Sequence, residues 1–406
     1  MKLKPILLSA AIALGAVALT SCTNDVTPAE IEQYTPQPPP AEEEQLPATS
    51  EDEEEPYAPT PIGTTEDGCE YGYADESGES IIIMGYTGAE TEIEIPAAIE
   101  GKPVTVIGEF AFAENYELTS VIIPDGVYEI ERDAFYDCSA LTSVTVPDSV
   151  SKIGAGAFSD CSALTSFAFP DGVEVIENVV LYGCSSLTEL TLPEGATVIE
   201  PGAFAYCYSL TSVDIPDTVT VIGAVAFGDC KSITSITIPD SVTEIGSSAF
   251  SGSGLTHADI PDSVIKLGDS VFRSCYELTS VNISANVTNI GYCTFDNCTS
   301  LTSVVIPDGV TEIGERAFKD CRSMTSVTIP DSVASIGYSA FVDCDSLTSV
   351  TIPRSVTYID ERAFGYKGYF FEEPYLKEDF EIYCYFDTAA EQYAYENGIP
   401  YTYIRD

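Results

Sequence analysis

The stretch L-T-S-V-V-I-P-D-G-V-T-E-I-G-E-R-A-F-K-D-C-R-S, residues 301–323, decides the fold of this chain. Leu301, Val304 and Ile306 have the L-x-x-L-x-L spacing of a short strand whose apolar side chains point alternately toward the interior. The Pro-Asp-Gly triplet that follows predicts a turn, because proline presets one backbone angle and an aspartate side chain can bond nearby backbone.

The second half of the unit returns the chain to the same interior. Val310 and Ile313 are spaced to reach the core again, which predicts a second short strand. Ala317, Phe318 and Cys321 complete the coil, and we expect them on a short helical turn because a 23-residue unit leaves little room for a long helix. The unit therefore predicts one coil with an apolar interior.

This unit recurs every 23 residues, with a single step of 22. A phenylalanine column, in which Leu181 fills the one gap, marks the repeat at Phe112, Phe135, Phe158, Phe204, Phe227, Phe250, Phe272, Phe295, Phe318, Phe341 and Phe364. A fixed period of this kind indicates one supersecondary unit stacked about twelve times. We expect a single solenoid that is mainly β, with short parallel strands and short helical turns.

The consensus I-P-D-S-V-T-x-I-G-x-x-A-F-x-x-C-x-S-L-T-S-V resembles the BspA-type leucine-rich repeat family of bacterial cell-surface lipoproteins. The motif is nearly intact at residues 238–260 and 306–327, and the resemblance covers roughly residues 69–406. It implies a leucine-rich-repeat solenoid and a role as an adhesin or protein binder. The motif is far less specific for a ligand than for an architecture.

Changes in composition divide the chain into five expected segments. They are a lipoprotein signal peptide at 1–21, a lipidated cysteine and disordered acidic, proline-rich tether at 22–68, an N-terminal cap at 69–100, the repeat solenoid at 101–366 and a C-terminal cap at 367–406. The tether follows from residues 23–67, which hold 13 acidic residues and no Lys or Arg, and so cannot bury enough apolar surface to order themselves.

The first residues indicate export and lipid anchoring. Lys2 and Lys4 precede an apolar run at 6–19, and Leu19-Thr20-Ser21-Cys22 resembles the bacterial lipobox, in which cleavage occurs before a cysteine that carries diacylglycerol. An uncleaved membrane helix is the alternative, but the run is shorter than the roughly 20 residues needed to span a bilayer. We predict that Cys22 is lipidated and that the protein is exposed at the cell surface.

Both ends of the repeat array are expected to carry caps. The alternating residues Glu92–Ile95 favour strands over the first coil. At the other end, Thr388–Glu391 has the pattern of a helix capping box and Gly398 that of a helix stop, so we expect a helix at about 389–397. Solenoids require such caps to cover their last hydrophobic faces.

Charge excludes several classes of function. The chain has 16 Lys plus Arg against 65 Asp plus Glu, a formal charge of -49, which argues against nucleic acid and against anionic lipid as partners. With His257 as the only histidine, there is little room for a histidine metal site. We expect a monomer with no cofactor and no metal, whose only membrane contact is the lipid anchor.

Nine cysteines form a column one coil apart: Cys138, Cys161, Cys184, Cys207, Cys230, Cys275, Cys298, Cys321 and Cys344. Stacked coils lie ~5 Å apart, which makes disulfides or a metal conceivable. Each cysteine, however, occupies one fixed inward position that a small hydrophobe would fill equally well, and C-x-x-C spacing is absent. We expect free buried thiols in the column. Pairing of Cys69, Cys293 and Cys384, which lie outside it, stays open.

An acidic column follows the prolines: Asp125, Asp148, Asp171, Glu194, Asp217, Asp240, Asp262, Asp308 and Asp331. Bound calcium would relieve the repulsion between stacked carboxylates. The simpler interpretation is that each acidic side chain closes its own turn while solvent screens the row. Calcium binding by this column stays an open alternative.

The coil at 251–260 is the irregular one, because it contains the 22-residue step and the only histidine. His257 and Asp259 occupy outward strand positions, and Asp214 and Asn282 lie in the same outward column. We predict that these four residues contact ligand. Asp214 and Asp259 would be ~10 Å apart, near the upper range of an inverting glycosidase pair, but neither carboxylate has an evident means of staying protonated.

The sequence therefore favours a non-catalytic surface binder that holds a host or microbial protein or glycan on its repetitive face. Two alternatives remain: a glycan-acting hydrolase on the coiled scaffold, and a purely structural envelope protein. A nearly regular Ser/Thr face lacks the convergent groups that catalysis needs.

Overall fold

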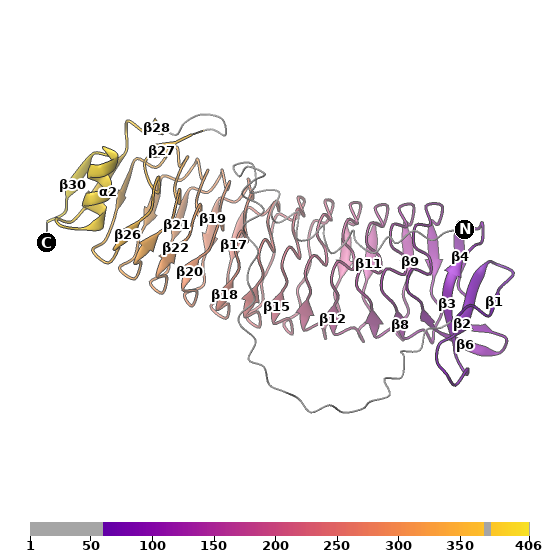
Figure 1. Ribbon diagram of the computed structural model, residues 1–406. Coiled ribbons are helices and arrows are strands. Elements are labelled where there is room, and N and C mark those ends of the chain that lie inside the picture. The colour runs from indigo at the N-terminus through magenta and orange to yellow at the C-terminus, as the bar shows by residue number, and fades with distance from the viewer. Residues whose placement is uncertain (1–59, 369–374, 406) are drawn as a thin grey trace, which may run out of the picture. The chain divides into compact units, whose positions relative to one another are not determined.

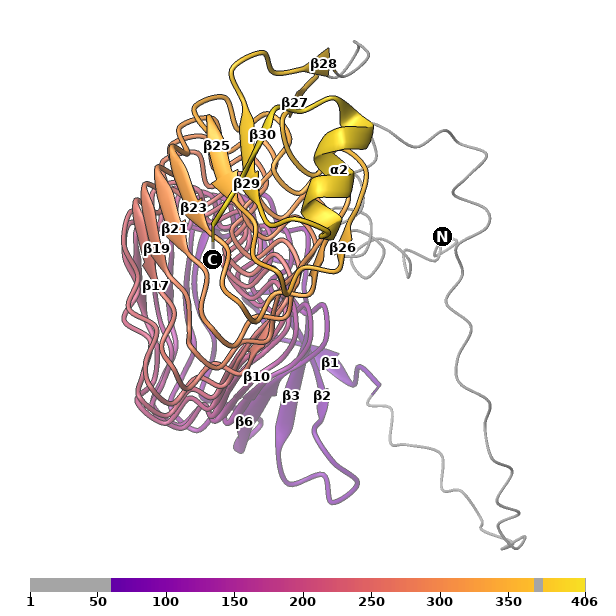
Figure 2. The same cartoon turned by 90° about the vertical axis from the view of Figure 1, so that its left-hand side faces the viewer.

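A computed structural model describes residues 60–368 and 375–405 as a stack of coils, each wound around a shared apolar interior (Figure 1). Two ladders of short parallel strands run along the stack. The front ladder contains the three-residue strands that precede the proline turn, and the rear ladder contains the two-residue strands that follow it. The two ladders lie on different sides of the coils, as the view in Figure 2 shows.

The front ladder contains β4 (Glu92–Glu94), β7 (Ser120–Ile122), β9 (Ser143–Thr145), β11 (Ser166–Ala168), β13 (Glu189–Thr191), β17 (His257–Asp259), β19 (Ser280–Asn282), β21 (Ser303–Val305), β23 (Ser326–Thr328), β25 (Ser349–Thr351), β29 (Glu381–Cys384) and β30 (Tyr401–Tyr403). Paired strands are parallel and in register one repeat apart, as in Val121 opposite Val144. The middle residue of each strand points inward and its neighbours point outward, as the period of two requires.

The rear ladder contains β6 (Lys102–Ile107), β8 (Glu129–Ile130), β10 (Lys152–Ile153), β12 (Val175–Ile176), β14 (Val198–Ile199), β15 (Val221–Ile222), β16 (Glu244–Ile245), β18 (Lys266–Leu267), β20 (Asn289–Ile290), β22 (Glu312–Ile313), β24 (Ser335–Ile336) and β26 (Tyr358–Ile359). Its second residue is the inward one, so Ile222 and Ile313 are fully buried. Five of these strands, from β12 to β18, pair without interruption.

The segment expected to be a short helical turn consists of overlapping tight turns at 314–321. The amide of Phe318 donates to Ala340 O on the next coil at 2.8 Å, whereas the amide of Lys319 donates back to Arg316 O at 3.1 Å. Arg316 has a φ of 53°, outside the helical range. Hydrogen bonds within the turn alternate with hydrogen bonds to the next coil, and together they satisfy the backbone amides of this segment. An α-helix would need a longer segment to do the same.

The inward columns form one continuous core. Val310, Ile313 and Phe318 are 0% exposed, as the repeat predicts, and so are most of their counterparts. Neighbouring phenylalanine rings stack along the column, with centroids of Phe135 and Phe158 5.0 Å apart at an interplanar angle of 3°. The fold predicted from the repeat is confirmed: a mainly β solenoid of 23-residue coils.

Strands cover the first coils at the N-terminal end. Antiparallel strands β1 (Gly63–Thr64), β2 (Cys69–Tyr73) and β3 (Ile81–Tyr86) extend the rear ladder, in which β3 pairs with β6. A further short strand, β5 (Ala98–Ile99), pairs with β6 from the other edge. Cys69 and Ile83 bury their side chains against the coils.

Helix α2 (Ala389–Asn397) covers the last coils, at the residues predicted for it. Thr388 Oγ1 accepts from the amide of Glu391, and Gly398 ends the helix with a φ of 67°. The Glu391 carboxylate bonds the amide of Asp387 rather than that of Thr388, so the capping box is shifted by one residue. Between β26 and α2 the chain also forms a hairpin of β27 (Tyr366–Lys367) and β28 (Tyr375–Leu376).

The predicted signal peptide, the predicted lipidation site Cys22 and the expected tether as far as residue 59 lie outside the described residues. In the part of the chain that the structure describes, no helix has the length and apolar character needed to cross a bilayer.

Candidate functional site

The front ladder presents the outward Ser and Thr side chains, but only some of these hydroxyls are free. The threonine just before each strand donates its hydroxyl to the carbonyl of its counterpart in the preceding coil, as Thr165 does to Thr142 and Thr279 to Thr256. Such hydroxyls are occupied by the fold. In contrast, the outward hydroxyls of Thr145 and Thr328 are exposed and have no partner among the described residues.

His257 and Asp259 project from β17, and each bonds a residue of β19. His257 Nδ1 lies 2.9 Å from Ser280 Oγ, and Asn282 Nδ2 donates to Asp259 Oδ1 at 2.8 Å. The strands are in register, with His257 opposite Ser280 and Asp259 opposite Asn282, and all four side chains are exposed. Three of the four predicted contact residues therefore form one polar patch on adjacent strands.

The missing residue of the 22-residue step lies in a loop and not on this patch. The spacing from Cys230 to Ser253 is the normal repeat, whereas the spacing from Thr234 to Thr256 is one residue shorter. The shortening therefore falls at Gly254, where a Cβ would collide with the carbonyl oxygen of Lys231. The irregularity expected in the coil at 251–260 therefore lies in its loop, because glycine absorbs the deletion before β17 begins.

The regular face breaks one to two coils earlier, at residues 211–215 and 234–238. The front ladder has no paired strand between β13 and β17, although the rear ladder stays continuous through the same coils. Neither Thr211 nor Thr234 donates its hydroxyl to the preceding coil, as their counterparts Thr188 and Thr256 do. In these coils the rear strands pair but the front segments do not. The regular spacing of the sequence repeat does not predict this difference.

A shallow groove occupies this opening. Its floor is apolar and its rim is acidic, with Leu192, Ile215 and Pro216 in the floor and Glu194, Asp214 and Asp217 at the rim. The groove places Asp214 apart from the patch on β17, because the coil that carries Thr237 lies between them. Asp259 is not among the residues that line the groove.

Each thiol of the cysteine column donates to a backbone carbonyl. Cys230 Sγ lies 3.2 Å from Phe204 O in the preceding coil, and all nine column thiols make the equivalent bond at 3.0–3.3 Å. Burial raises the pKa of Cys138 and Cys207 to about 12. The thiols are therefore protonated donors, a role that the small hydrophobe considered for this position could not take.

Cys69, Cys293 and Cys384 are also buried, and none of them forms a disulfide within the described residues. Within residues 60–368 and 375–405, no group of three or more His, Cys, Asp or Glu side chains is placed to hold a metal ion. In the acidic turn column, Asp262 Oδ1 accepts from the amide of Ala285 in the next coil instead of closing its own turn. Neighbouring hydroxyls join the other turns, as Ser149 Oγ does by donating to Val127 O.

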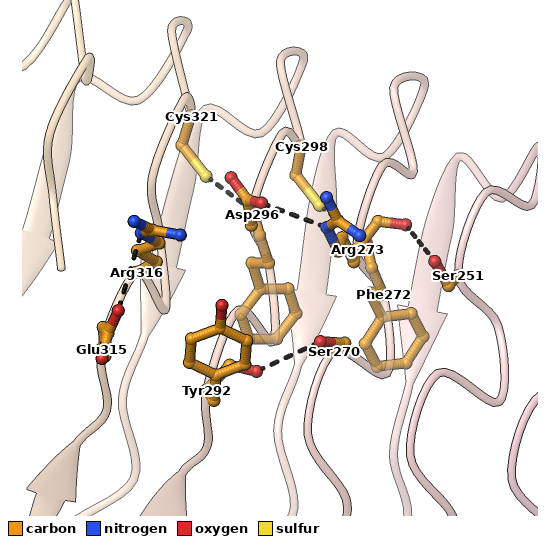
Figure 3. Close-up of polar contacts among 11 residues, drawn as sticks. Ser251, Ser270, Phe272, Arg273, Tyr292, Asp296, Cys298, Glu315, Arg316 and Cys321 are labelled. Carbon is orange, nitrogen blue, oxygen red and sulfur yellow. Dashed lines mark hydrogen bonds and ion pairs between the residues drawn. The ribbon is translucent and has the colours of Figure 1, made fainter. Parts of the chain in front are cut away.

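A charged seam that sequence reasoning missed lies beside the phenylalanine column (Figure 3). Arg273 Nε and Asp296 Oδ2 are 3.2 Å apart on adjacent coils, and both side chains are almost fully buried. Burial raises the pKa of Asp296, while Lys319 and Arg273 act to lower it. Arg273, Asp296 and Lys319 occupy the same repeat position in three successive coils. Aligning the repeats would therefore have shown that the charge at this position alternates between positive and negative. Their charges face one another, which indicates a contact between coils.

A family model described as "BspA type Leucine rich repeat region (6 copies)" matches residues 105–207, 197–321 and 289–372. No curated protein matches the chain.

Several solved structures are similar. A leucine-rich repeat protein from Bacteroides ovatus is 27% identical, with a TM-score of 0.60 over 84% of this chain and 99% of that one. One from Eubacterium ventriosum is 24% identical, with a TM-score of 0.52 over 76% and 95%. The pneumococcal vaccine antigen PcpA is 15% identical, with a TM-score of 0.57 over 85% and 98%. The last two show the fold alone.

Proposed function

Because the chain belongs to the BspA-type leucine-rich repeat family, we propose that it is a non-catalytic binding protein of the bacterial cell surface. It is held in the membrane by a lipid on Cys22, and it binds a host or microbial protein or glycan with the front ladder. The acyl anchor gives location, the acidic tether gives reach, and the stacked coils give a long binding face.

The observation that carries this proposal is the front ladder with its free outward hydroxyls. Rows of exposed Ser and Thr side chains, spaced one coil apart, suit a macromolecule that spans many coils. The groove at Asp214 and the patch at His257 and Asp259 are two places where this row changes, and a specific ligand would be distinguished there.

Hydrolysis of a glycan is less well supported. A pair of catalytic carboxylates must face one bond of the substrate from two sides. Asp214 belongs to the acidic groove, whereas Asp259 accepts from Asn282 on an open strand face two coils away. No enclosed site brings the two carboxylates together in the described residues.

Binding is tested by probing the full-length protein against arrays of host proteins and glycans. A triple variant, Asp214→Thr, His257→Ser and Asp259→Thr, should weaken the strongest interaction about ten-fold or more, since these exposed groups carry the distinctive contacts. Thr328→Ser, which keeps an outward hydroxyl, is the matched control. Turnover of a glycan or peptide that the triple variant abolishes would overturn the non-catalytic assignment.

Anchoring is tested separately by Cys22→Ala. This variant should incorporate no radiolabelled lipid and should leave the membrane fraction or accumulate as a precursor, because the thiol that carries the lipid is gone. Cys69→Ala removes a buried cysteine and should keep the lipid. Unchanged lipid incorporation in the Cys22 variant would refute the anchor.

A further inference from the structure

Three tyrosines gather on the edge of the coils that carries the phenylalanine and cysteine columns. The ring centroids of Tyr182 and Tyr206 are 5.1 Å apart at an interplanar angle of 69°, and those of Tyr206 and Tyr208 are 6.0 Å apart at 75°. These residues, called the tyrosine cluster below, come from two adjacent coils and three different repeat positions. Tyr208 is 40% exposed, and the other two are partly exposed.

The fold does not require an aromatic residue at the centre of this cluster. Tyr206 has a φ of 62°, in a turn position that other coils fill with residues suited to this conformation, such as Asp160, Gly183, Asp229 and Asn297. A bulky side chain there costs on the order of 1 kcal/mol of backbone strain. The backbone of this turn therefore does not favour a tyrosine, and strain of this kind concentrates at binding sites.

Charged groups border the tyrosine cluster on both sides. The Asp160 carboxylate lies against Gly183 on the coil of Tyr182, and Asp229 follows Tyr206 in the turn column. Lys231 Nζ lies 4.8 Å from the centroid of the Tyr208 ring and 3.5 Å from Asp229 Oδ1. The aromatic faces are therefore surrounded by hydrogen-bonding groups rather than by an apolar rim.

The phenol groups themselves are available. Within the described residues, none of the three hydroxyls has a hydrogen-bond partner. Burial, followed by the neighbouring Tyr182 and Asp229, raises the pKa of Tyr206 to about 12. The phenol is therefore protonated at neutral pH. Beyond Lys231 the loop of the next coil is the shortened one, where Gly252 and Gly254 add no side chain to cover the edge.

We propose that the tyrosine cluster is a binding subsite for an uncharged glycan, with sugar rings packed on Tyr182 and Tyr206 and sugar hydroxyls bound by Asp160, Asp229 and Lys231. This inference rests on the proposed function and specifies one ligand class. Sugar rings present a C–H face that packs on an aromatic ring and a perimeter of hydroxyls that matches carboxylates and an ammonium group.

The charges decide between ligand classes. Two carboxylates at the border repel anionic sugars, in a chain with a formal charge of -49. Lys231 already occupies the cation position over Tyr208, so an external cation would have to displace it. A protein hot spot needs neighbouring contacts that exclude water, whereas the border of this cluster is charged and open.

The test is titration of the full-length protein with maltohexaose, cellohexaose, mannohexaose, xylohexaose and chitohexaose, followed by saturation-transfer NMR and calorimetry. At least one of these neutral sugars should bind, and Tyr182→Ala and Tyr206→Gly should each weaken that binding about ten-fold or more. Tyr276→Ala is the matched control, because Tyr276 occupies the repeat position of Tyr208 and is 52% exposed. It should change the affinity less than two-fold.

Tyr206→Gly also separates binding from folding. Glycine suits a φ of 62°, so this variant should unfold at the same urea concentration as the wild type or at a higher one, while it loses the sugar. The inference is overturned if none of the five sugars binds, or if the bound sugar is held equally well by the Tyr182 and Tyr206 variants. A protein or glycan captured on the arrays without loss in these variants would leave the proposed function standing and remove this subsite.

Discussion

At the scale of the residue, the hydrogen bonds of the cysteine column explain why cysteine recurs at one position of the repeat. Cys207 Sγ lies 3.3 Å from Leu181 O and Cys275 Sγ 3.2 Å from Phe250 O, so the thiol joins its coil to the preceding one even where the phenylalanine is replaced. In the shortened coil Ser253 takes this position and contacts Cys275 Sγ at 3.3 Å. The column is a row of weak inter-coil hydrogen bonds in addition to a row of small side chains.

Cys230→Ala should therefore destabilise the protein more than the same change at Cys384. Both thiols are buried, but within residues 60–368 and 375–405 the thiol of Cys384 donates to no carbonyl, whereas that of Cys230 donates to Phe204 O. The difference in the free energy of unfolding, measured by urea denaturation, should be about 0.5–1 kcal/mol, the size of a weak hydrogen bond. Equal losses would mean that the column cysteines act as spacers only.

At the scale of the element, the coils compensate for one another. Leu181 interrupts the phenylalanine stack, and Phe167 of β11 and Phe169, just after this strand, restore it from the front ladder. The ring centroids of Phe158 and Phe167 are 5.0 Å apart, and those of Phe169 and Phe204 6.4 Å apart. A repeat array can thus lose a core residue in one coil when its neighbours supply the missing volume.

The hydroxyl of Tyr393 joins helix α2 to the backbone of the last coil. Tyr393 Oη accepts from the amide of Phe364 at 3.0 Å and donates to its carbonyl at 3.1 Å, and the side chain is 5% exposed. Tyr393→Phe keeps the ring but leaves both backbone groups buried without a partner. We expect a loss of about 1–3 kcal/mol in the free energy of unfolding.

Urea denaturation and hydrogen exchange at residues 389–397 measure this effect. Tyr395→Phe is the matched control, since Tyr395 is on the same helix and 76% exposed. A Tyr393 variant as stable as the control would show that the hydrophobic face of α2, and not this hydroxyl, holds the cap.

At the scale of the whole molecule, the buried thiols of the cysteine column make similar contributions to stability in successive coils. Burial raises the pKa of Cys275 to about 11 and those of Cys138 and Cys207 to about 12, above the ordinary value of 9.0. Because the unfolded chain releases these protons first, the contribution is present below pH 9 and is lost as pH rises toward the folded pKa values. A solenoid with nine such thiols should weaken markedly in alkali.

The urea midpoint should accordingly fall between about pH 8 and pH 10, over a range in which thiols ionise before most tyrosines. A double variant, Cys207→Ala and Cys230→Ala, should be less stable at pH 7 and should lose less stability over the same interval. A pH dependence identical to that of the wild type would show that the buried thiols are not responsible.

The sequence by itself determined the coil. The 23-residue spacing of Val310, Ile313 and Phe318 predicts which side chains are buried, because each coil repeats the same local pattern of turn and strand. It also predicted helix α2 from its capping residues, and the outward patch of His257, Asp259 and Asn282 from strand alternation.

Only the tertiary structure showed which residues of neighbouring coils contact one another. The carbonyl that accepts from each thiol is about one coil away, the opening at Asp214 depends on strands that fail to pair, and Tyr182 meets Tyr206 from a different repeat position. These contacts depend on the separation and rotation of neighbouring coils, which backbone pairing and side-chain volume set together. A one-dimensional repeat does not encode that geometry, so the groove and the tyrosine cluster become visible only when the coils are stacked.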